Sequence, residues 1–106
     1  MAHCSLAINV GSFNNPSTRH GLAHFLEHMI FMGSEKYPDE NGYNEHISMH
    51  GGECNAYTEF EWTNFFLNVN YGGLRTTLDM LASAFHKPKL AKGAIDREIN
   101  AVESEF

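Results

Sequence analysis

Apolar and polar residues alternate in three short parts of the chain, and this alternation predicts β-strands. The first run covers residues 5–10, and two further runs cover residues 54–58 and 63–69. Only residues 59–62 separate the last two runs, so we expect them to form a β-hairpin. The residues expected on the buried faces of the first and last strands are Leu6, Ile8 and Val10, and Phe65, Leu67 and Val69.

Elsewhere apolar residues recur every three or four positions, which predicts α-helices. We expect helices near residues 21–33, 39–50, 74–85 and 91–105, with Asp39 as the N-cap of the second. The residues expected to end the first three helices are Gly33, the pair Gly51 and Gly52, and Pro88. The apolar stripes expected to face the core are Leu74, Leu78, Leu81 and Phe85 in the third helix and Ile95, Ile99, Val102 and Phe106 in the fourth. The order β-α-α-β-β-α-α predicts an α+β domain with helices packed on a mainly antiparallel sheet.

The helix expected near residues 21–33 combines an apolar surface with a small ionisable cluster. It is apolar on nearly every side, which predicts a buried helix. Between its two glycines, the ionisable residues are His24, Glu27 and His28. At about 100° per residue, the two histidines lie roughly 40° apart on the helix, with Glu27 about 60° to one side. Because burying such groups without partners is costly, we expect them to have a partner.

The spacing of these three residues predicts a metal site. Two histidines four positions apart can bind one metal ion, and a neighbouring carboxylate can act on water bound to that ion. The pattern H-x-x-E-H is the inverted zinc-protease motif. A catalytic zinc site also requires a third protein ligand.

The last helix offers two pairs of acidic residues as the source of that ligand. Glu98 and Glu105 lie seven positions apart on one flank of its apolar stripe, and Asp96 and Glu103 lie on the other flank. The helical wheel does not choose between the two flanks. Both flanks also fit ordinary solvated charges, which is the usual state of acids beside an apolar stripe.

Two stretches of the chain resemble the pitrilysin–insulinase family of zinc peptidases, the inverzincins. They are GLAHFLEHMIFMGSEKYPDENGYNEHISMHGGECNAYTEFEWTNFF, residues 21–66, and DREINAVESE, residues 96–105. The similarity extends over residues 7–105. It implies an antiparallel sheet with helices in each homologous domain, and a clamshell formed by pairs of such domains.

The resemblance also implies roles for single residues. The family's third zinc ligand is a Glu 77 positions after the second His, which matches Glu105, while the acid seven residues earlier, Glu98, orders the site without binding the metal. Asn55 and Ala56 match a pair that holds an extended substrate along a strand edge. The implied ligands of one zinc ion are then His24, His28 and Glu105, with Glu27 as the general base.

We therefore expect a zinc-dependent endopeptidase that cleaves peptides. The alternative is a non-catalytic homologue that acts as a binding or assembly subunit. Glu27 favours the enzyme, because a zinc-binding scaffold would not need a base beside the metal.

Length, charge and cysteine content limit the number of domains, the partners and the cellular compartment that we expect. With 106 residues the chain is one domain at most, and we expect residues 1–106 to be part of the N-terminal catalytic domain of a longer enzyme, whose remaining domains are its partners. By itself this segment is expected to be weakly active or inactive. A net charge of −6 argues against a nucleic-acid partner, and no apolar run is long enough to span a membrane. Cys4 and Cys54 are expected to be free thiols, which favours the cytoplasm and leaves mitochondrial and exported forms open.

Overall fold

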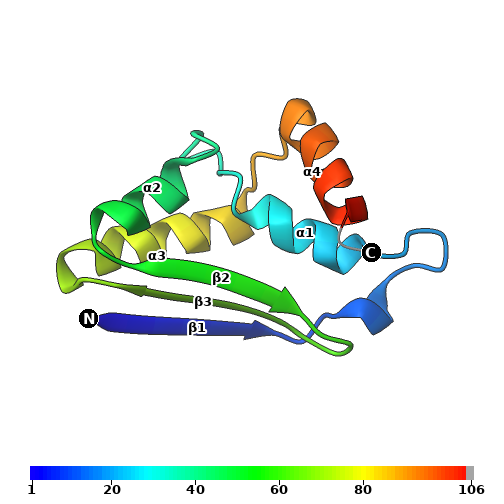
Figure 1. Cartoon of the computed structure of the whole chain (residues 1–106), viewed down its shortest axis with the longest axis horizontal. Helices are drawn as coiled ribbons and strands as arrows, with labels where there is room; N and C mark the ends of the chain where they lie inside the picture. The colour runs from blue at the N-terminus through cyan, green and yellow to red at the C-terminus, as the bar shows by residue number, and fades with distance from the viewer. Residues whose placement is uncertain (105–106) are drawn as a thin grey trace.

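The computed structural model describes residues 1–104, which form a three-stranded antiparallel sheet and four α-helices (Figure 1). The elements in chain order are β1 (Ala2–Ile8), the 3-10 helix η1 (Ser12–Asn14), α1 (Leu22–Ile30), α2 (Gly42–Met49), β2 (Glu53–Thr58), β3 (Thr63–Val69), α3 (Tyr71–His86) and α4 (Lys92–Ser104). The predicted order of strands and helices and the α+β class are confirmed. In this described part, no helix is both long enough and apolar enough to cross a lipid bilayer.

β3 is the central strand of the sheet, and β1 and β2 are its two edges. The predicted hairpin is confirmed, because β2 pairs antiparallel with β3 and the Glu59 N–H donates to the Trp62 carbonyl across the turn at 2.7 Å. β1 pairs with the other side of β3, so Cys4 and Cys54 both lie opposite Leu67. Within the described sheet the outer edge of β2 has no neighbouring strand, and α1 packs beside β2.

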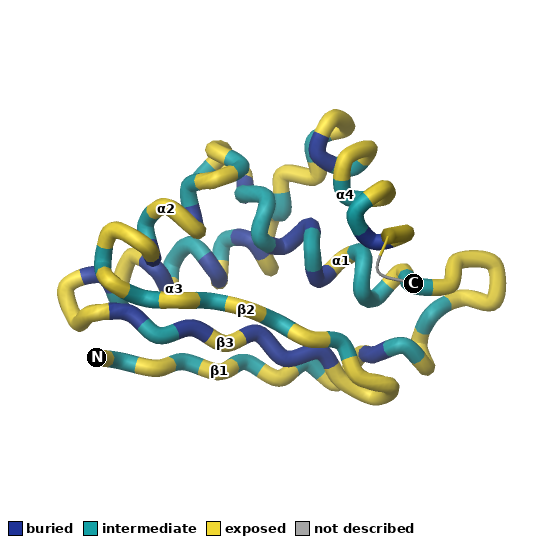
Figure 2. The backbone as a smooth tube through the Cα atoms, in the orientation of Figure 1, coloured by how far each residue is buried: buried dark blue, intermediate teal, exposed yellow. Residues whose placement is uncertain are grey.

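The hydrophobic core lies between β3 and the helices α1, α2 and α3. Figure 2 shows β3 as the most continuously buried strand, in keeping with its central position. The inward positions predicted for this strand are confirmed. The buried members of the core are Ile30, Tyr43, Ile47, Phe65, Leu67, Val69, Leu81 and Ala84. Helix α4 packs against α1 and stands away from the sheet (Figure 1).

The first strand starts and ends earlier than predicted. It covers Ala2–Ile8, and Val10, which was expected on its buried face, is 46% exposed. The reason is the length of its partner, because Ile8 already pairs with Thr63, the first residue of β3. Beyond Ile8 the chain turns, and the Val10 N–H donates to the Ile8 carbonyl at 2.8 Å.

Helix α1 is shorter and more exposed than predicted. It ends at Ile30 rather than near Gly33, and the Phe31 and Met32 N–H groups bond to the carbonyls three residues before them. Gly33 still turns the chain, with φ +99°. The expectation that the helix is buried on nearly every side is wrong, since Leu22 and Leu26 are 44% and 48% exposed. The neighbours of α1, namely β2 and α4, cover its other sides.

The predicted cap of the second helix is also wrong. Helix α2 begins at Gly42 with Asn41 as its N-cap. The Asp39 carboxylate instead accepts a hydrogen bond from the Asn41 N–H at 3.0 Å, which closes an Asx turn before the helix. The predicted end is confirmed, because His50 is the C-cap and Gly51 follows with φ +68°.

Helices α3 and α4 bury faces that are rotated from the predicted stripes. In α3, Thr77 is fully buried while Leu78 is 38% exposed. Thr77 tolerates burial because its hydroxyl donates to the Gly73 carbonyl at 2.7 Å. In α4, Ile99 is 42% exposed and Val102 is buried, and Phe106 lies outside the described residues.

Candidate active site

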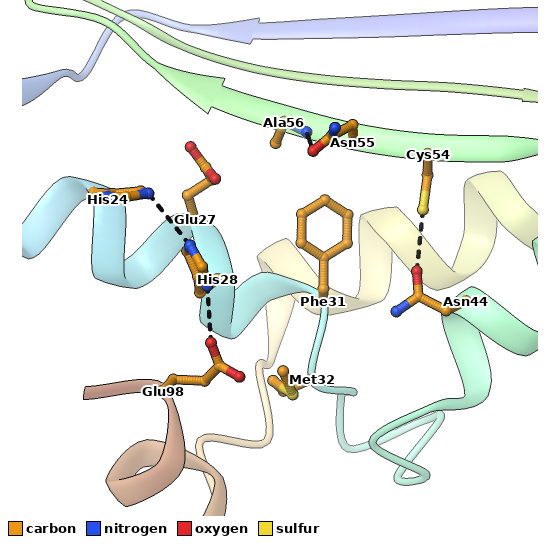
Figure 3. A pocket seen from close by; sticks show the side chains of 10 residues that line it. All are labelled: His24, Glu27, His28, Phe31, Met32, Asn44, Cys54, Asn55, Ala56 and Glu98. Carbon is orange, nitrogen blue, oxygen red and sulfur yellow. Dashed lines mark hydrogen bonds and ion pairs between the residues drawn. The ribbon is translucent and has the colours of Figure 1, made fainter. Parts of the chain in front are cut away.

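Helix α1 brings His24, Glu27 and His28 together on the side that faces β2 and α4 (Figure 3). The Nε2 atoms of the two histidines lie 3.2 Å apart, and one donor atom from each of the three residues lies within 4.8 Å of the others. The start of the helix is fixed locally, because Gly21 adopts φ +81° and the Asn15 side chain accepts a hydrogen bond from the Ala23 N–H at 2.9 Å. In the described residues, this trio is the cluster of possible ligand side chains that could hold a metal ion.

The two imidazoles fit a zinc ion. Zinc binds histidine nitrogen at about 2.0–2.1 Å with tetrahedral geometry, so two such nitrogens lie about 3.3 Å apart. The observed separation of 3.2 Å between His24 Nε2 and His28 Nε2 is close to this value. The helix therefore holds the two nitrogens at a spacing that fits zinc, and at this distance the two rings also form a hydrogen bond with each other.

A carboxylate from α4 fixes the ring of His28. Glu98 Oε2 lies 2.8 Å from His28 Nδ1, and both side chains are mostly buried. Because a carboxylate oxygen accepts, Nδ1 donates this hydrogen bond, and Nε2 lies on the side of His24. Histidines that bind metals have this kind of partner on their other nitrogen, and it sets their tautomer and orientation.

The packing of α4 on α1 also distinguishes the two acidic flanks that the helical wheel left equal. Glu98 faces α1, whereas Asp96 and Glu103 are exposed to solvent. Glu105, the third predicted ligand, lies outside the described residues.

Glu27 is held by a residue that the sequence analysis missed. The Thr58 hydroxyl donates to Glu27 Oε1 at 2.7 Å, and the Glu27 side chain is buried. Thr58 ends β2, on the same face of the strand as Ala56. The alternation of the strand was a usable signal, because it places Thr58 on the face that also carries one of the predicted substrate-binding residues.

A hollow of about 400 Å³ extends from the trio along β2 (Figure 3). Both predicted substrate-binding residues, Asn55 and Ala56, line it. The Ala56 N–H bonds to the amide oxygen of Asn55 at 2.8 Å rather than to a strand partner. The residues that line this hollow are His24, Glu27, His28, Phe31, Met32, Asn44, Cys54, Asn55, Ala56 and Glu98.

The thiol of Cys54, which lines this hollow, is in its neutral form. Burial raises the pKa of Cys54 above its usual value, and its Sγ donates to the Asn44 side-chain oxygen at 3.2 Å. A thiol must be deprotonated to act as a nucleophile or a metal ligand. The chemistry of the hollow therefore rests on the imidazoles and carboxylates.

The sequence of the chain is similar to those of known proteins. The model of the insulinase family, peptidase family M16, matches residues 1–106. The chain is 50% identical over 104 residues to the A-factor-processing enzyme of Saccharomyces cerevisiae, and the match covers 98% of this chain and 10% of that protein. It is 49% identical over 102 residues to human (Homo sapiens) nardilysin, covering 96% of this chain and 9% of that protein.

The fold of the chain is also similar to that of a solved structure. The crystal structure of pitrilysin matches with a TM-score of 0.92 at 44% identity, over 97% of this chain and 11% of that one. The chain thus spans about a tenth of the length of the curated relatives it matches. By sequence and by fold, it belongs to the insulinase family of peptidases, as its resemblance to that family led us to expect.

Proposed function

We propose that this chain carries the zinc-binding part of an endopeptidase that cleaves peptides. The observation that supports this most strongly is the convergence of two histidine nitrogens, 3.2 Å apart, beside the buried carboxylate of Glu27. His24, His28 and Glu105 would hold one zinc ion per catalytic domain, with Glu105 assigned from the family resemblance alone. When bound, the ion supplies a water of lowered pKa and stabilises negative charge on the substrate carbonyl oxygen.

Glu27 performs the proton transfers in this proposal. One carboxylate oxygen, Oε1, is engaged by the Thr58 hydroxyl at 2.7 Å, which fixes the plane of the group. The other oxygen accepts a proton from the attacking water and then delivers it to the leaving amine. The burial of Glu27 keeps bulk water away from this exchange.

Glu98 keeps the metal site in order without binding the ion. Its hydrogen bond to His28 Nδ1 holds the ring so that Nε2 points toward His24.

The edge of β2 holds the substrate. The Ala56 N–H is satisfied by the side chain of its own neighbour, Asn55, and a substrate carbonyl can replace that oxygen. A peptide that adds to a strand edge must be extended, so the substrates are flexible peptides rather than folded proteins.

Residues 1–106 are part of one catalytic domain in a longer enzyme that we place in the cytoplasm. The location is supported by Cys4 and Cys54, which are both free and lie on opposite sides of β3. Free thiols are the usual state of cysteine in a reducing compartment.

The test is Glu27→Gln in the full-length protein. This change keeps the size of the side chain and removes the base, so zinc content should persist while cleavage of an unstructured peptide falls by at least roughly 10²–10⁴-fold. Glu45→Gln, which changes an exposed carboxylate on α2, is the matched control and should leave cleavage unchanged. Near-normal turnover by Glu27→Gln would refute the role of Glu27. A wild-type protein that binds zinc and cuts no peptide would favour the scaffold instead.

A further inference from the structure

A second hollow lies beside the candidate active site. It has a volume of about 630 Å³ and shares His24, Glu27 and Ala56 with the first hollow. From these shared residues it extends toward the loop around η1 and the turn between β2 and β3. The residues that line the second hollow and not the first are Ser12, Phe13, Asn15, His20, Gly21, Tyr57, Thr58 and Phe60.

Two exposed phenyl rings form one wall of this hollow. Phe13 and Phe60 stack with their centroids 5.0 Å apart and their planes at 21°. They are 70% and 64% exposed, so neither ring is buried in the core. Tyr57, which is 41% exposed, adds a third ring to the lining.

The backbone, rather than side-chain burial, holds these rings in place. The Phe13 N–H donates to the Phe60 carbonyl at 2.8 Å, and the Ser12 N–H donates to the Glu59 carbonyl at 2.9 Å. Gly11 allows this approach, because a Cβ there would lie 2.4 Å from the Glu59 carbonyl oxygen. The loop and the turn are thus joined before any ligand arrives, which lowers the entropy lost on binding.

We propose that this second hollow binds an aromatic side chain of the peptide substrate, with Phe13 and Phe60 as the residues that determine specificity. This inference rests on the proposed peptidase function. Because Glu27 and His24 border both hollows, a peptide lying along β2 across Glu27 passes from one hollow into the other. The bound side chain therefore belongs to a residue close to the scissile bond.

The chemistry of the lining selects an aromatic occupant. The second hollow contains no Lys, Arg or Asp among its lining residues, and its one carboxylate, Glu27, already accepts a hydrogen bond from Thr58. A cationic substrate side chain would lose water there without gaining an ion pair beyond the catalytic group, and an acidic one would meet His20 and His24 beside the carboxylate of Glu27. Aromatic rings, in contrast, pack favourably against exposed rings at centroid separations of about 4.5–7 Å.

The experiment compares peptides that carry Phe or Ala at single positions around the cut, using the full-length protein. For wild type, we expect kcat/KM to be roughly 10- to 100-fold higher with Phe at one position next to the scissile bond. In the double variant Phe13→Ala with Phe60→Ala, that ratio should fall toward one. Tyr71→Ala, which removes a ring that is 76% exposed on α3, is the matched control and should keep the ratio.

Binding measured without catalysis separates this inference from the proposed function. In a Glu27→Gln background, fluorescence anisotropy of the labelled Phe peptide should show the same loss of affinity when Phe13 and Phe60 are removed. A wild-type protein with no aromatic preference, or a double variant that retains the preference, would overturn the inference while leaving the peptidase proposal intact. Ring-dependent binding by a protein that cuts neither peptide would uphold the hollow and refute the peptidase proposal.

Discussion

Replacing Thr58 with Val tests how strongly a single hydroxyl supports the proposed base. Val has nearly the shape of Thr, so the change removes the hydrogen bond of 2.7 Å to Glu27 Oε1 and little else. Glu27 is 7% exposed, and the Thr58 hydroxyl is the donor that the structure gives to its Oε1. A hydrogen bond to a charged group contributes about 1.5–3 kcal/mol. Losing this bond lets the carboxylate turn out of the position needed for proton transfer. If that energy is lost as positioning, at about 1.4 kcal/mol per factor of ten, kcat should fall roughly 10- to 100-fold.

The assay measures kcat and KM separately, together with zinc content and Tm, on the full-length protein. KM should change less than kcat, because the lost hydroxyl holds the Glu27 carboxylate, while Val keeps most of the surface with which Thr58 lines the second hollow. Thr58→Ser is the matched control, since it keeps a hydroxyl and should recover most of the activity. A Thr58→Val enzyme with kcat within about twofold of wild type would refute the reasoning, as would a Thr58→Ser enzyme that is equally impaired.

Three further changes probe the metal site and the core. The double variant His24→Ala with His28→Ala should lose zinc, and full metal occupancy by elemental analysis would contradict the ligand assignment. Glu98→Gln should weaken zinc affinity by about 10–100-fold in a chelator competition assay, and less than removal of either histidine does, so an unchanged affinity would count against its role. Burial raises the pKa of Tyr43 above its usual value of 10.0. Tyr43 therefore ionises first in the unfolded chain as the pH rises through about 10, and the folded state loses stability there. Between about pH 8 and about pH 11, urea unfolding should show a smaller loss of unfolding free energy for Tyr43→Phe than for wild type. Equal losses in the two proteins would contradict the role of Tyr43.

Much of the fold follows from residue periodicity, and what does not follow depends on packing between elements. The alternation in residues 63–69 predicted a strand with the observed bounds, because a central strand is paired on both sides over its whole length. The first strand was harder to place, since its end is set by where β3 begins. Leu22 and Leu26 look like core residues in the sequence, and only the positions of β2 and α4 show that they face outward.

In the candidate site, too, some features follow from the sequence and others depend on how the elements pack. His24, Glu27 and His28 share a helix, so their spacing alone predicted that they would converge. Glu98 belongs to a different helix, and periodicity alone could not prefer its flank to that of Asp96; the family resemblance chose it, and the packing of α4 on α1 gives the physical reason. Thr58 was missed because threonine is common at strand ends. Only the face of β2 on which its side chain lies distinguishes it. Contacts within one helix or between strands joined by a short turn could be predicted from periodicity, whereas side-chain contacts between distant elements, such as Thr58 with Glu27, required the structure.

The strand pairings also determine the order in which the chain can fold. Thr63 pairs with Thr58, five residues before it, and with Ile8, 55 residues before it. Closing the longer loop costs about 2 kcal/mol more in chain entropy, so we expect the β2–β3 hairpin to form before β1 joins it. Helix α1 lies inside that longer loop and meets Thr58 only when it docks on the hairpin. During synthesis, β1 emerges before β3, and about 55 further residues must follow it before its partner strand is available.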